Sequence, residues 1–355
     1  MGDFGTLFPL AIGYFAVNGL NPAGLLVMMG LANIVTGVIY HLPMPIEPKK
    51  VLAVVAITQR WPPSLIYATG FGTGVIWLIL GFTGLIQKIA ALTPRSVVRG
   101  IQIALGVMLA IEGFKMVATG WILGIVSIVI VIVLRENRYA PAAIVLMMIG
   151  IGVVGFRGEL MQAIDLGFTL PPITLFRPVE IWQGLVLAGF AQIALTGTNA
   201  VIATSALISQ YFPNKPVPEK KLALNMGIMN VVVPFFGGMP MCHGAGGLAG
   251  QYYFGARTGG TNIIEGIIEI SLGLFLAGSI ATLFALFPQS IIGAMLLLVG
   301  VQLIGFVREI RKNELIMMAL TAGVSLATNM AIGFAAAVIV YHSLRKWKAV
   351  ARYVA

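Results

Sequence analysis

Long apolar stretches recur along this chain, and they limit what it can fold into. Leu123–Leu134, Pro141–Val154 and Ser271–Leu286 contain no charged residue. Hydrophobic residues make up 59% of the sequence, more than a soluble domain could cover with polar surface. The stretches do not alternate between polar and apolar residues, as the strands of a transmembrane barrel would. We therefore expect an all-α integral membrane protein.

Breaks at proline, glycine and charged clusters divide the chain into about fourteen segments. They lie near 3–20, 23–41, 43–59, 62–90, 94–118, 120–134 and 140–156, and then near 179–211, 219–236, 238–255, 260–286, 289–307, 311–328 and 330–346. Segments 43–59 and 238–255 are too short and too often interrupted by Pro or Gly to be ordinary spans, which need about 20 residues.

The basic residues indicate how these segments are oriented. With a cytoplasmic N-terminus, most of the 22 lysines and arginines fall in inside loops or in the C-terminal tail. This asymmetry follows the positive-inside rule, so the net charge of +10 reports topology rather than a nucleic-acid partner. We expect a multi-pass protein of the cell membrane with both termini in the cytoplasm.

The two halves of the chain resemble each other. "PRSVVRGIQIALGVML" from Pro94 aligns with "PQSIIGAMLLLVGVQL" from Pro288, and Met44–Pro45 aligns with Met239–Pro240 at nearly the same offset. Because each unit holds an odd number of segments, the second copy enters the membrane from the opposite side, as in secondary transporters. We predict a first repeat over 1–156, an extracellular connection over 157–178, a second repeat over 179–346 and a cytoplasmic tail over 347–355.

The two short segments occupy equivalent places in this repeat. Each begins with an extended stretch rich in Pro or Gly and then becomes compatible with a helix. A helix that begins halfway across a membrane points free N–H groups and the positive end of its dipole into a cavity. Two such ends that face each other make an anion site. The sequence therefore predicts half-helices in segments 3 and 10.

The motifs "PMPIEPKKVLAV" and "MPMCHGAGGLAGQYYFGARTG", with "GDFGTLFPL" near the N-terminus, resemble signatures of the molybdate transporter family, a branch of the sulfate-permease superfamily. The resemblance covers essentially the whole chain. It implies a seven-plus-seven inverted repeat, in which segments 1–4 and 8–11 form a core domain that carries the oxyanion and the others form a gate domain. It also suggests a homodimer. Because the sequence ends at Ala355, we expect no soluble regulatory domain of the kind that ends many sulfate permeases.

The first signature departs from the family pattern at two positions. Glu47 and Lys49 stand where family members usually carry Gln and Met, whereas Lys50 is kept. A carboxylate beside an anion is repulsive unless it is protonated or paired with a lysine. Glu47 is therefore either a proton-coupling residue or the partner of Lys50. We expect Ile46, Glu47, Lys49 and Lys50 to form the exposed start of this half-helix.

The candidate substrate-binding residues lie at the two half-helix starts and in the first span of each repeat. Several have a structural alternative: His243 as a satisfied core histidine, Cys242 as a packing residue, and Thr198 with Asn199 as groups that bond neighbouring helices. The full set is Thr6, Pro45, Ile46, Glu47, Lys50, Thr198, Asn199, Met241, Cys242, His243, Gly244 and Ala245.

Other intramembrane charges have structural explanations. Glu265 and Glu269 are one helical turn apart and are expected to pair with Arg257. Glu112 is expected to pair with Lys115 in the same way.

No pattern in the sequence indicates an enzyme, a metal site or a cofactor. Cys242 is the single cysteine, and Ser-His-Asp, HExxH and phosphate-loop patterns are absent. The leading prediction is a secondary transporter that moves molybdate or sulfate by alternating access, with a cotransported proton as one way to drive it. The alternatives are an anion channel and a nucleobase:cation symporter. The symporter is disfavoured because Ile181–Tyr211 and Gly238–Gly255 contain no Asp or Glu.

Overall fold

The apolar segments form helices throughout, in a computed structural model that describes residues 4–134, 137, 141–309, 311 and 314–354. The first half contains α1 (Phe4–Ala16), α2 (Pro22–Tyr40), α3 (Lys50–Thr58), α4 (Pro63–Thr83), α5 (Ile86–Leu92), α6 (Arg95–Val117), α7 (Trp121–Leu134) and α8 (Ala142–Phe156). A short helix, α9 (Leu160–Ala163), lies in the connection between the halves.

The second half repeats this order. It opens with one continuous helical segment made of α10 (Pro178–Gly184), the π-helix η1 (Leu185–Gly189), α11 (Phe190–Thr196), the π-helix η2 (Gly197–Ile202) and α12 (Ala203–Tyr211). It continues with α13 (Glu219–Val232), η3 (Val233–Phe236), α14 (Ala245–Tyr253), α15 (Gly260–Phe275), α16 (Ala277–Leu286), α17 (Gln289–Gly305), η4 (Phe306–Glu309), α18 (Leu315–Ala327) and α19 (Met330–Val354).

Several of these helices can cross a membrane by length and composition. Within the described residues, α2, α4, α6 and the segment Pro178–Tyr211 are long and apolar enough, and α15 with α16 forms a further candidate bent by 80°. Shorter apolar helices of 10–17 residues include α7, α8, α17 and α18. The chain is a multi-pass, all-α membrane protein built as an inverted repeat.

Two of the predicted segments are broken. Segment 62–90 divides because Gly84 adopts a left-handed conformation with φ 68°, which ends α4 before α5 begins. Segment 260–286 divides at Leu276, whose φ of −126° is not helical, and α15 and α16 meet there at 80°. The two breaks occupy equivalent places in the two halves.

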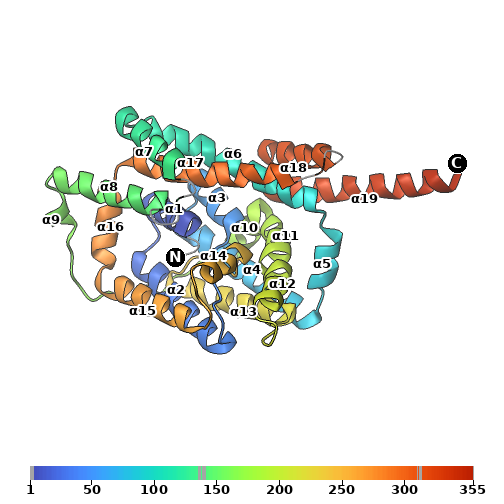
Figure 1. Cartoon of the computed structure of the whole chain (residues 1–355), viewed down its shortest axis with the longest axis horizontal. Coiled ribbons are helices and arrows are strands. Elements are labelled where there is room, and N and C mark those ends of the chain that lie inside the picture. Colours follow the sequence, from blue (N-terminus) through green and yellow to red (C-terminus); the bar gives the residue numbers. More distant parts are fainter. Residues whose placement is uncertain (1–3, 135–136, 138–140, 310, 312–313, 355) are drawn as a thin grey trace.

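The helices form two layers with the half-helices between them (Figure 1). α6, α7, α17 and α18 lie across the top of the view, α2, α13 and α15 lie at the bottom, and α14 lies between them. α2 packs along α15 and α4 packs along α13, while α6 packs along α17. The lower layer belongs to the core domain and the upper layer to the gate domain.

Glycines allow the closest of these helix pairs. A Cβ at Gly106 would lie 2.7 Å from the Gly300 carbonyl oxygen, and a Cβ at Gly300 would lie 2.7 Å from that of Gly106. Gly113 and Gly293 make the same reciprocal contact farther along α6 and α17. Gly30 and Gly266 make the same kind of reciprocal contact between α2 and α15. Small residues therefore let the backbones of both helix pairs approach closely.

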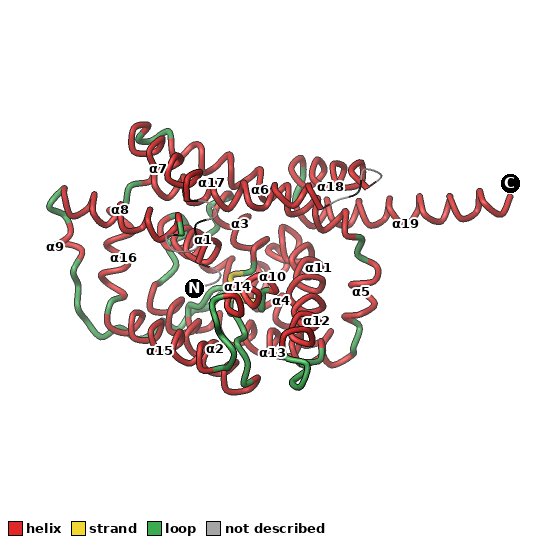
Figure 2. Tube along the Cα trace, viewed as in Figure 1, coloured by secondary structure: helices red, strands yellow, loops and turns green. Residues whose placement is uncertain are grey.

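The predicted half-helices are confirmed. α3 and α14 have 9 residues each. Such a helix is about 14 Å long, roughly half of a hydrocarbon core about 30 Å thick. The strands β1 (Glu47–Pro48) and β2 (Met241–Cys242) precede them and pair antiparallel, with Glu47 opposite Cys242 and Pro48 opposite Met241 (Figure 2). Because each strand leads into its helix, α3 and α14 leave the strand pair in opposite directions and their N-termini meet there.

Local sequence explains why the chain is extended before each half-helix. α2 ends at His41 with φ 54°, and the prolines that follow at 43, 45 and 48 keep the residues before them out of the helical region. On the other side, Gly237 ends η3 with φ 73°, and Pro240 precedes β2. The Lys49 N–H donates to the Pro240 carbonyl oxygen at 3.0 Å, which extends the strand pair by one bond.

Candidate functional site

The strand pair brings most of the predicted site residues together. The stretch 45–50 faces the stretch 241–247 through backbone pairing and side-chain contacts. The prediction that this start of α3 is exposed was wrong for Ile46, Glu47 and Lys49, which are 4%, 2% and 0% exposed. β2 and α14 cover them, and only Lys50 keeps a partly exposed side chain.

The Glu47 carboxylate closes the N-terminus of α14. Its Oε1 accepts a hydrogen bond from the Gly247 N–H at 3.0 Å. Its Oε2 lies 3.2 Å from the Lys50 ammonium, so the predicted pairing of these two residues is confirmed. A Cβ added at either Gly244 or Gly247 would collide with this carboxylate. The two glycines therefore let an anionic group come directly onto the helix end.

The N-terminus of α3 is closed by a different residue, Gln192 of α11. Its side-chain oxygen accepts from the backbone N–H groups of Val51 at 2.7 Å and Leu52 at 3.3 Å. Its amide nitrogen donates to Thr196 Oγ1 at 2.6 Å, which fixes the orientation of the side chain. Sequence reasoning missed Gln192, although an amide inside an apolar span is a signal of function or of buried backbone partners.

Both half-helix tips thus use an oxygen acceptor from another element. The N-cap residue of α3, Lys49, makes no capping bond with its side chain, and the N-cap residue of α14, Gly244, has no side chain that could make one. The acceptor at α14 is a carboxylate, and the acceptor at α3 is a neutral amide. N–H groups at a helix start donate equally well to the oxygens of an anion, so each tip is chemically suited to an oxyanion.

Lys49 is a fully buried cation beside the strand pair. Its ammonium donates to Thr73 Oγ1 at 2.6 Å, and no carboxylate pairs with it among the residues that the structure describes. The Tyr14 hydroxyl of α1 is also completely buried and has no hydrogen-bond partner in the described part of the chain. The Lys49 ammonium and the Tyr14 hydroxyl therefore have donor hydrogens available for a further hydrogen-bond acceptor, and buried polar groups are normally paired.

His243 and Cys242 have mainly structural surroundings in this conformation. The His243 ring is completely buried, with Nδ1 lying 3.2 Å from the Pro45 carbonyl oxygen and Nε2 lying 2.9 Å from Asn225 Oδ1. Both ring nitrogens are therefore engaged. Cys242 is 7% exposed, and its Sγ lies 4.0 Å from the Pro48 carbonyl oxygen.

Thr198 and Asn199 lie in the π-helix η2 and are half-buried. The Thr198 hydroxyl donates to carbonyl oxygens of its own helix, those of Ala194 and Leu195. Extra-wide helical turns of this kind are frequent at functional sites. Thr6 belongs to α1, but its side chain falls outside the described residues.

Two asparagines that sequence reasoning also missed hold the extended chain in place. Asn230 of α13 accepts from the Met241 N–H at 2.9 Å and donates to the Met241 carbonyl oxygen at 2.7 Å. Asn262 of α15 accepts from the Met44 N–H at 2.9 Å and donates to the Met44 carbonyl oxygen. Each side chain bonds both the N–H and the carbonyl oxygen of one extended residue, as a neighbouring strand would. These backbone groups would have no hydrogen-bond partner in lipid.

The remaining charged residues are only partly as predicted. Glu112 pairs with Lys115 at 3.7 Å, as expected, and also with Arg60 at 3.2 Å. The predicted pairing of Glu265 and Glu269 with Arg257 was wrong. Glu269 instead accepts a hydrogen bond from Asn33 at 2.9 Å, and the Arg257 guanidinium lies 3.6 Å from the Tyr252 ring centroid.

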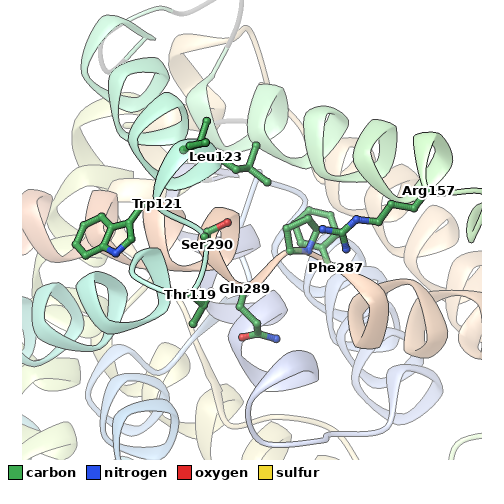
Figure 3. A pocket seen from close by; sticks show the side chains of 10 residues that line it. Thr119, Trp121, Leu123, Arg157, Phe287, Gln289 and Ser290 are labelled. Carbon is green, nitrogen blue, oxygen red and sulfur yellow. The ribbon is translucent and has the colours of Figure 1, made fainter.

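A pocket of about 620 Å³ opens at one end of the bundle (Figure 3). It is lined by the turn 119–123, by Arg157 and by the turn 287–290. The side chain of Arg157 lies beside Phe287 at its rim. The segment order places these three connections on the same side of the membrane. None of the residues that line this pocket belongs to the half-helix tips.

The chain matches a family model described as "Molybdate transporter of MFS superfamily" over residues 1–109 and 184–303, which include both half-helices. It is 31% identical to "Molybdate transporter 1" of Arabidopsis thaliana, over 96% of this chain and 86% of that protein. It is 28% identical to "Molybdate transporter 1" of Chlamydomonas reinhardtii, over 94% of this chain and 88% of that protein. A "Putative sulfate transporter YbaR" of Bacillus subtilis is 24% identical, over 83% of this chain and 64% of that protein.

Solved structures share the fold. The transmembrane domain of the cyanobacterial bicarbonate transporter BicA superposes with a TM-score of 0.62 at 17% identity, over 94% of this chain and 97% of that one. The structure of SLC26A9 superposes with a TM-score of 0.72 at 12% identity, over 98% of this chain and 64% of that one.

Proposed function

Because this chain belongs to the molybdate transporter family, we propose that it moves a tetrahedral oxyanion, molybdate or sulfate, across the cell membrane by alternating access. The observation that carries the proposal is the meeting of two half-helix N-termini at a buried strand pair. Each helix end carries about half a positive charge, and the two ends act on the same small volume.

The charges around the strand pair favour an anion. Lys49 and Lys50 lie there with one carboxylate, that of Glu47, so the formal balance is positive before the helix dipoles are added. A dianion with oxygens on all sides can accept from backbone amides and from an ammonium at once. We infer that the amides of Ala245 and Gly246 and the Lys50 ammonium are the main ligands, since Gly246 is exposed and Ala245 and Lys50 are half-buried.

Further side chains complete the proposed site. Thr198 and Asn199 lie on the distorted helix η2, where the widened turn frees polar groups, and Thr6 is their counterpart in the first repeat. Pro45, Ile46, Met241, Cys242, His243 and Gly244 shape the strand pair and present its backbone. In this proposal they set the size of the site rather than its charge.

Transport of a dianion into a cell needs a driving force. An inside-negative potential opposes entry by about 2.3 kcal/mol per charge per 100 mV. Cotransport of a proton would offset part of that cost, so we include proton coupling in the proposal. We also propose that both termini lie in the cytoplasm, that the repeats span 1–156 and 179–346, and that the chain forms a homodimer, as the resemblance implies.

Uptake by the purified full chain in proteoliposomes tests the function. We expect saturable uptake of labelled molybdate, inhibition by excess sulfate, and stimulation by an inward proton gradient. Absence of both molybdate and sulfate uptake would reject the assignment. A large ohmic current would indicate an anion channel, and stabilisation by uracil or xanthine alone would indicate a nucleobase carrier.

A further inference from the structure

We propose that the Glu47 carboxylate is a built-in competitor of the transported oxyanion, which holds the amide end of α14 until the substrate displaces it. This inference rests on the proposed function. It identifies the group that occupies the site when the substrate is absent.

The position of the carboxylate is that of a bound anion. One oxygen accepts from Gly247, the third residue of α14, and the other faces the Lys50 ammonium at 3.2 Å. The side chain is 2% exposed, and there is no space for a Cβ at Gly244 or Gly247 beside it. Glu47 therefore fills the tip of α14 rather than lying near it.

The ligands proposed for the oxyanion include one partner that Glu47 now uses, the Lys50 ammonium, and adjoin the other, the Gly247 N–H. Molybdate and sulfate present anionic oxygens, which bind N–H groups at helix starts and ammonium groups just as a carboxylate does. An oxyanion bound to the Gly246 N–H and the Lys50 ammonium would lie at contact distance from the Glu47 carboxylate, and like charges at that distance repel strongly. Substrate binding at this tip thus requires the carboxylate to leave.

The fold gives Glu47 a way to leave without disturbing the helix. It belongs to β1 and not to α14, so in this proposal its side chain leaves the tip without being part of the helix that the substrate binds. Gly246, between the two glycines that contact the carboxylate, is exposed, and an added Cβ there would meet no atom within 4 Å. The substrate can approach from that open side.

The other half-helix has no such competitor. Gln192 closes the tip of α3 with a neutral amide, which does not repel an anion. The two tips are therefore unequal, and displacement at α14 is the step that limits affinity. A returning carboxylate also helps to expel the substrate, so the same residue that weakens binding speeds release.

The experiment compares wild type, Glu47→Gln and Glu180→Gln by calorimetric titration of the full chain with molybdate and with sulfate. Gln keeps an oxygen for the Gly247 N–H but removes the charge, so we expect Glu47→Gln to bind both oxyanions at least tenfold more tightly. Glu180 is the matched control because its carboxylate also serves a helix start, accepting from the Arg177 N–H at 2.7 Å at the N-terminus of α10. We expect its replacement to leave affinity unchanged.

An infrared difference spectrum of wild type supplies a readout that does not depend on a variant folding. Addition of molybdate should shift a carboxylate stretching band as Glu47 leaves Gly247 and Lys50. No shift in wild type, or equal or weaker binding by a folded Glu47→Gln protein, overturns the inference while the transport function stands. If wild type binds no oxyanion at all, the proposed function fails instead.

Discussion

The side-chain oxygen of Gln192 lies 2.7 Å from the backbone nitrogen of Val51, and so one repeat of the fold caps the half-helix of the other. Glu47 of the first repeat does the same for α14 of the second. The proposed anion site therefore exists only where the two halves meet. Changes at either cap should alter anion binding more than they alter folding.

Replacement of Gln192 by Glu should weaken molybdate binding at least tenfold. The new carboxylate would bring a negative charge to the tip of α3, where the oxyanion must lie, and a tenfold change corresponds to about 1.4 kcal/mol. Titration of the purified protein measures it. Gln87→Glu on the exposed face of α5 is the matched control and should have no effect. Unchanged affinity in Gln192→Glu would show that the anion does not approach α3.

Replacement of Lys49 by Met should lower oxyanion affinity by about tenfold without destabilising the protein. Burial of the Lys49 ammonium has a desolvation cost, so its charge contributes little to the stability of the fold. The same charge attracts an anion strongly because the surrounding dielectric constant is low. Affinity and thermal unfolding of the same sample separate the two effects. Lys220→Met at an exposed position of α13 controls for the loss of one charge. A stable variant with wild-type affinity would show that Lys49 does not contribute to oxyanion binding.

Replacement of Asn230 by Leu should destabilise the protein and reduce binding together. It leaves the N–H and the carbonyl oxygen of buried Met241 without partners, at a cost of about 1–3 kcal/mol for each group. Thermal unfolding in detergent measures the first effect and titration the second. Asn329→Ala removes an exposed cap of α19 and should cost less. Equal losses in both variants would contradict a special role for the Met241 clamp.

Replacement of Gly300 by Ala should destabilise the contact between α6 and α17 by about 1–3 kcal/mol, the usual cost of overpacking. The new methyl would press on the backbone of Gly106, which cannot rotate away as a side chain could. Gly152→Ala on α8 is the control: nothing lies within 4 Å of an added Cβ, and Ala favours a helix over Gly. Unfolding in detergent should show opposite signs for the two variants.

The elements read most directly from the sequence were those set by local chemistry. Apolar runs long enough for helices, prolines that interrupt them and glycines at the turns predicted the helical bundle and the two half-helices. The pairing of Glu47 with Lys50 was also predictable, because the two residues are only three positions apart, although Glu47 lies in β1 and Lys50 begins α3.

The errors came from contacts between residues far apart in the chain. Glu269 was expected to pair with Arg257 on a nearby loop. Its carboxylate instead accepts a hydrogen bond from Asn33 of α2, because α2 and α15 pack side by side. The start of α3 was expected to be exposed, but β2 covers it.

The sequence by itself determined that this chain forms membrane helices and that two of its segments, α3 and α14, are half-helices preceded by extended chain. Hydropathy and backbone stereochemistry are properties of neighbouring residues, so they can be inferred from the sequence. Only the tertiary structure decided which groups close the interrupted ends. The partners of Gly247 and Val51 come from the opposite repeat, and their positions depend on how two distant segments pack.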